Sequence, residues 1–193
     1  MRFALGALAL ALVSTSAFAE NCPAERAVYA LHDADDGDFR VQLVPSLHMA
    51  SIASDLYLKL TTPRHSYWFT FTVSNGYGGI TVMPVSDPYA ASAKEDGPRD
   101  LLEPSYDAEE GIDGEMLAQL RFFAMDDALG VLDDPPRMGE PAPPYLMMPD
   151  LGLALWYNFQ YLSEDTEDTN DSLPRGVFRL AECLEEAPPG AYP

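Results

Sequence analysis

Basic side chains are scarce in this sequence. It contains 11 Lys plus Arg against 31 Asp plus Glu, a formal net charge of −20 over 193 residues. Nucleic acids and anionic lipid surfaces bind proteins through clusters of positive charge. The composition therefore argues against nucleic acid and anionic membranes as partners. It describes an acidic protein whose 47% apolar residues are enough for a packed core.

Long hydrophobic runs are also missing, apart from one near the N-terminus. Residues 4–13 are apolar, follow Arg2, and precede Ala17-Phe18-Ala19, the small-x-small pattern that signal peptidase cleaves. The run is shorter than the about 20 apolar residues that a membrane span requires. We predict a signal peptide over residues 1–19, no membrane span, and a periplasmic or secreted protein. A retained N-terminal anchor is the alternative.

Cysteine is limited to Cys22 and Cys183. Neither lies in a CxxC pair or beside a histidine cluster, which argues against a redox or zinc site. An even pair in an exported chain is typical of a disulfide. We therefore predict a Cys22–Cys183 disulfide that joins the first and last strands, with two free or metal-binding thiols as the alternative.

Alternation of apolar and polar residues is the dominant pattern of the sequence. Residues 66–74 alternate Tyr67, Phe69, Phe71 and Val73 with Ser, Trp and Thr, and Asn75-Gly76 follows as a hairpin turn. Residues 151–161 alternate in the same way, and we expect a strand there. Weaker strand patterns cover residues 27–31, 39–44, 56–61, 80–83, 121–125, 129–132 and 176–183.

This pattern predicts an all-β fold with minor α content. We expect one antiparallel β-sandwich or barrel-like domain over residues 20–186, followed by a flexible Pro-rich tail over residues 187–193. Short helices are predicted over residues 46–54 and 113–120. Residues 87–111, 135–149 and 163–172 are rich in proline, acidic residues or glycine and predict long loops.

Catalytic motifs are absent from the sequence. It has no G-x-S-x-G elbow, no S-x-x-K, no HExxH and no phosphate-binding or dinucleotide-binding glycine loop. The three histidines, His32, His48 and His65, are not spaced as metal ligands. With 31 acidic residues, no carboxylate pair can be selected for glycoside hydrolysis. We assign no catalytic residue.

One loop has the composition of a cation site. Asp33, Asp35, Asp36 and Asp38 surround Gly37, and closely spaced carboxylates can bind calcium. The EF-hand pattern fails, because its glycine is at the fifth position and Val44 stands at the twelfth. The acidic run over residues 164–171 is similar. Calcium is the one cofactor that we consider, and a hydrated hairpin turn without an ion is the alternative.

Aromatic side chains give the most specific binding hypothesis. Trp68 lies on the polar face of its predicted strand, Asn75 and Tyr77 lie in the turn that follows, and Trp156 lies on the thinner face of the second strand. Exposed Trp and Tyr on a rigid sheet anchor sugars or protein partners. The alternative is a sheet covered on both faces, with Trp68 and Trp156 in the core.

These observations favour an exported, non-enzymatic β-domain. Its expected partner is an envelope protein, a glycan or a small ligand. Two alternatives are kept. The first is a hydrolase whose site is assembled from dispersed His, Ser and Asp residues. It requires two of the three histidines, or one histidine with a carboxylate and a hydroxyl, to meet in one cleft. The second is a surface module stabilised by calcium.

Overall fold

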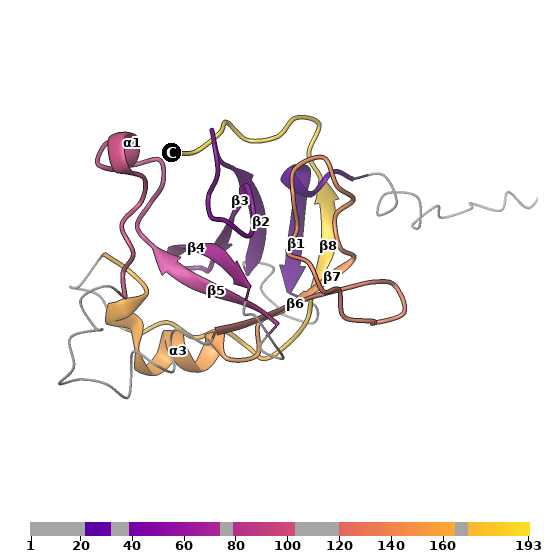
Figure 1. Cartoon of the computed structure of the whole chain (residues 1–193). Helices are drawn as coiled ribbons and strands as arrows, with labels where there is room; N and C mark the ends of the chain where they lie inside the picture. Colours follow the sequence, from indigo (N-terminus) through magenta and orange to yellow (C-terminus); the bar gives the residue numbers. More distant parts are fainter. Residues whose placement is uncertain (1–21, 32–38, 74–78, 103–119, 165–169) are drawn as a thin grey trace, which may run out of the picture.

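The protein is a closed antiparallel barrel of eight strands, in which each strand pairs with the next in sequence and β8 pairs with β1 (Figure 1). The computed structural model describes residues 22–31, 39–73, 79–102, 120–164 and 170–193. This architecture confirms the all-β fold with minor α content. The strands are β1 (Ala27–Leu31), β2 (Arg40–Pro45), β3 (Leu56–Thr61), β4 (Ser66–Val73), β5 (Ile80–Val85), β6 (Leu120–Met125), β7 (Tyr145–Met147) and β8 (Phe178–Cys183).

Helical segments are short. They are η2 (Ala24–Arg26), α1 (Ala93–Asp96), α3 (Leu151–Tyr157) and η4 (Phe159–Tyr161). Within the described ranges, none of the helices has the length and apolar character that crossing a membrane requires.

The barrel interior is filled by large apolar side chains. Alternate residues of β3 and β4 point inward, and Leu58, Leu60, Phe69 and Phe71 are fully buried. The rings of Phe71 and Phe122 meet edge-on with centroids 5.0 Å apart. Such contacts explain why the alternation in the sequence locates these strands correctly.

A disulfide ties the two strands that close the barrel. Cys22 and Cys183 are bonded, with their Cα atoms 5.8 Å apart, and Ala27 of β1 pairs with Cys183 of β8. This confirms the predicted bridge between the first and last strands. Disulfides of this kind are typical of proteins that fold in an oxidising compartment.

The last residues of the chain pack on the outer face of the barrel. Leu47 N donates to Ala191 O at 2.8 Å, and Ala191 N donates to Pro45 O at 2.8 Å. The Tyr57 hydroxyl donates to Tyr192 O at 2.7 Å. The segment that we expected to be a flexible tail is therefore attached to the barrel. Ala191 completes a second apolar cluster with Val44, Tyr57, Trp68 and Val85.

The expected strand over residues 151–161 is wrong, because this segment forms α3 and then η4. Leu151, Ala154 and Leu155 share one helical face and are buried. The barrel is already closed without this segment, so a strand here would find no free edge to pair with. Its place between β6 and β8 is taken by β7, which lies in the proline-rich stretch expected to be a loop.

Three other expectations need correction or lie outside the described residues. Residues 46–54 do not form a helix. A turn closes there instead, in which the Ser51 hydroxyl accepts hydrogen bonds from Ala53 N and Ser54 N, both at 3.1 Å. Residues 129–132 supply only one bridge, between Val131 and Met125, rather than a strand. Residues 113–119 of the second expected helix lie outside the described ranges, and Leu120 begins β6.

Candidate binding groove beside α3

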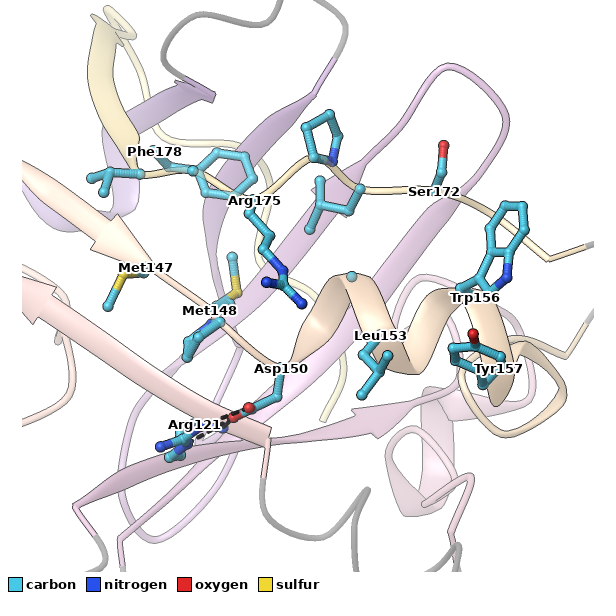
Figure 2. A pocket seen from close by; sticks show the side chains of 16 residues that line it. Arg121, Met147, Met148, Asp150, Leu153, Trp156, Tyr157, Ser172, Arg175 and Phe178 are labelled. Atoms are coloured by element: carbon cyan, nitrogen blue, oxygen red, sulfur yellow. Dashed lines mark hydrogen bonds and ion pairs between the residues drawn. The ribbon is translucent and has the colours of Figure 1, made fainter.

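A groove of about 730 Å³ lies between α3, the segment over residues 172–178 and the adjoining ends of β6 and β7 (Figure 2). This volume falls within the roughly 300–1,000 Å³ typical of small-molecule sites. The lining residues are Arg121, Met147, Met148, Pro149, Asp150, Gly152, Leu153, Trp156, Tyr157, Ser172, Leu173, Pro174, Arg175, Gly176, Val177 and Phe178.

The two walls of the groove are held together by close backbone contacts. A Cβ on Gly152 would lie 2.7 Å from the carbonyl oxygen of Leu173, so only glycine allows α3 this close to the opposite wall. Asp171 N donates to Leu155 O at 3.2 Å, and Asn170 Nδ2 donates to Trp156 O at 3.2 Å. The segment that carries Arg175 is thereby fixed against the helix.

The helical wall is apolar on both of its faces. The sequence of α3, LGLALWY, contains no charged residue, and its buried face packs into the barrel core. The opposite face leaves 47% of Leu153, 48% of Trp156 and 68% of Tyr157 exposed. A surface helix normally presents polar side chains to water. This outer face is therefore an apolar surface without a partner among the described residues.

One end of the groove holds a paired arginine. Arg121 Nε donates to Asp150 Oδ2 at 2.8 Å, and a terminal nitrogen of Arg121 donates to Asp150 Oδ1 at 2.7 Å. These bonds lower the pKa of Asp150 below the ordinary value of 3.8, against the smaller opposing effect of partial burial. They also raise the pKa of Arg121. Both groups are ionised at neutral pH, and their charges cancel.

Arg175 forms no hydrogen bond or ion pair with the described residues. Figure 2 shows its side chain leaving the wall over residues 172–178 and pointing toward α3. The groove therefore combines an apolar wall with a guanidinium that no described residue compensates.

The predicted binding residues have different outcomes. Trp156 lines the groove, although from a helix and not from the expected strand. Trp68 is only 5% exposed, which agrees with the alternative of a covered sheet face and not with an exposed binding ring: the C-terminal segment and the ring of Tyr89, 5.6 Å away, cover it. Asn75 and Tyr77 lie outside the described residues.

The proposed calcium loop also lies outside the described residues, since these do not include Asp33, Asp35, Asp36 or Asp38. Within the described part of the chain, no group of three His, Cys, Asp or Glu residues could hold a metal ion. Calcium binding by this loop stays a prediction.

The histidines do not assemble a hydrolytic site in the described structure. His48 precedes β3 and His65 follows it, so this six-residue strand, about 20 Å long, lies between them in the chain. His32 is not described. Asp171 accepts hydrogen bonds from Thr62 Oγ1 at 2.5 Å and from the Tyr67 hydroxyl at 3.1 Å.

This polar cluster has a structural explanation. Asp171, Thr62 and Tyr67 are between 1% and 5% exposed, so a substrate has no access to them. Their hydrogen bonds attach the segment after η4 to the turn between β3 and β4. The carboxylate and the two hydroxyls therefore meet in the interior rather than in a cleft, and the partly buried ring of His65 lies 6.0 Å from the ring of Tyr67.

Sequence reasoning missed most of the groove. Arg121, Asp150 and Arg175 come from three separate segments, and only the fold brings them together. The apolar residues of α3 also alternate along the sequence, and this alternation predicts a strand. Counting i, i+3 and i+4 positions would have found the buried face.

Comparison with known proteins assigns no family. No protein-family model, no curated protein and no solved structure matches this chain. The proposals below rest on the geometry of the groove.

Proposed function

We propose that this protein is an exported, non-enzymatic barrel that binds a small amphipathic ligand in the groove beside α3. The signal-peptide pattern over residues 1–19 and the Cys22–Cys183 disulfide support a periplasmic or secreted location. The groove favours a small ligand over the glycan and protein partners also considered, because it is concave and largely apolar.

The observation that carries this proposal is the exposed apolar face of α3. About half of Trp156 is open to water. For a Trp side chain of about 250 Å², covering that half would stabilise a complex by up to about 3 kcal/mol. Leu153 and Tyr157 extend the same surface along the helix. A bound apolar ligand would remove this exposure.

The titratable groups in the groove support binding rather than catalysis. Those among the lining residues are Arg121, Asp150, Tyr157 and Arg175. A general base must be free to accept a proton near neutral pH. Asp150 does not meet this requirement, since both of its oxygens are bonded to Arg121 and its pKa is lowered.

A neutral fluorescent probe tests the proposal. We expect N-phenyl-1-naphthylamine, which brightens in apolar surroundings, to bind the protein saturably. Trp156→Ala should weaken this binding by about tenfold. The free energy of a tenfold change is half or less of what covering the Trp156 surface could supply. The measurement is a titration followed through the fluorescence of the probe.

Val131→Ala is the matched control. Val131 is 57% exposed but lies outside the groove, so this variant should bind the probe like the wild-type protein. A wild-type protein that shows no saturable binding would refute the proposal, as would an equal loss of affinity in the two variants.

A further inference from the structure

The net charge of the groove has the opposite sign to the net charge of the chain. The chain carries a net charge of −20, yet the charged lining residues are Arg121, Asp150 and Arg175, which sum to one positive charge. Positive charge in a concave site attracts anions even when the rest of the surface is acidic.

Most described arginines have partners. Arg40, Arg99 and Arg121 contact Glu182, Glu164 and Asp150 respectively. Arg179 contacts Tyr145, and Arg26 donates to the carbonyl oxygen of Leu184. Among the described residues, Arg175 and Arg137 lack such a partner, and of these two only Arg175 lines the groove.

The position of Arg175 is suited to an amphipathic anion. Its guanidinium points toward α3, whose outer face exposes Leu153 and Trp156 along the same groove (Figure 2). A guanidinium presents a planar fork of donors that fits a carboxylate with two parallel hydrogen bonds. A ligand with one carboxylate and an apolar chain would satisfy both surfaces together.

We propose that the ligand of this groove is an apolar monocarboxylate, with its carboxylate on Arg175 and its chain on Leu153 and Trp156. This inference rests on the proposed binding function and specifies the class of ligand. A single negative charge matches the single uncompensated positive charge. A phosphate dianion would leave an excess negative charge beside Asp150 in an already acidic protein.

Displacement of N-phenyl-1-naphthylamine measures the preference. The competitors are decanoate, 1-decanol, protonated decylamine and decyl phosphate, which share one chain and differ in the head group. Decanoate should displace the probe at about tenfold lower concentration than decanol, because only decanoate can form a charge-assisted, partly exposed pair with Arg175. Decylamine and decyl phosphate should be weaker competitors than decanoate.

Two variants test whether Arg175 causes the preference for decanoate over decanol. Arg175→Gln should remove the preference for decanoate over decanol. Arg137→Gln makes the same change of charge outside the groove, at an arginine that also lacks a described partner, and should keep the preference.

The possible failures are distinguishable. If the probe binds but decanoate and decanol compete equally, or if Arg175→Gln keeps the preference, the carboxylate assignment is overturned and the binding function stands. Tighter binding of decyl phosphate than of decanoate would also overturn it. If the probe does not bind saturably, the proposed function fails, and this inference fails with it.

Discussion

Deleting residues 187–193 tests whether the C-terminal segment is part of the fold. The deletion removes Ala191 from the cluster around Trp68 and removes the hydrogen bonds from Leu47, His48 and Tyr57 to the segment. The entropy gained by freeing seven residues roughly offsets the lost hydrogen bonds. The remaining cost is the exposure of apolar surface on Trp68 and Tyr57.

The size of this cost follows from burial. Trp68 is 5% exposed and Tyr57 is fully buried. Uncovering about 100 Å² of their surface costs about 2.5 kcal/mol. For a chain of this length we expect a drop in melting temperature of about 5–10 °C. In a Trp156→Phe background, where Trp68 is the remaining tryptophan, the deletion should shift the fluorescence emission of Trp68 to longer wavelength.

Thermal unfolding and Trp68 emission are measured for the full and the truncated chains in the same background. Unchanged emission together with an unchanged melting temperature would refute the reasoning and restore the flexible tail that the sequence predicted. A lower melting temperature without a shift in emission would place the stabilising contacts away from Trp68.

Three further predictions concern stability. Replacing Cys22 and Cys183 by Ser should lower the free energy of unfolding by up to about 5 kcal/mol, because the bond closes a loop with a sequence separation of 161; urea midpoints that match those of the oxidised protein would contradict this. Tyr29→Phe should raise stability by about 1 kcal/mol in thermal unfolding, since the buried Tyr29 hydroxyl has no hydrogen-bond partner among the described residues; a large loss would show that it has one. Asp150→Asn should lower the melting temperature at pH 7. Because Arg121 lowers the folded-state pKa of Asp150, its contribution is complete above the ordinary value of 3.8 and is lost as the pH falls through the lowered pKa. The two melting curves should therefore converge in acid, and a constant difference down to pH 2 would contradict this.

The strands that could be predicted from sequence are those with one face inside the barrel. The expected strand over residues 27–31 matches β1, and the one over residues 56–61 matches β3. In these strands every second side chain packs in the barrel core, and this two-residue period is the one that defines a strand. The pairing of the two cysteines was equally accessible, because no other cysteine competes.

The parts that failed depend on tertiary contacts. The pattern over residues 151–161 fits both a strand and an amphipathic helix, and the closed barrel decides between them. Trp68 has an outward position on its strand, as expected, but a segment more than a hundred residues later in the chain covers it. Arg175 carries no local signal, because the role proposed for it depends on its lack of a partner among the described residues and on its position beside the apolar face of α3.

Quenching by 11-bromoundecanoate tests the central claim most directly, because bromine quenches tryptophan fluorescence only on close contact. In a Trp68→Phe variant, Trp156 is the one remaining tryptophan, and the account predicts strong, saturable quenching. In a Trp156→Phe variant the buried Trp68 should be almost unaffected. Absence of quenching at Trp156, or equal quenching of the two tryptophans, would contradict a bound chain on the outer face of α3.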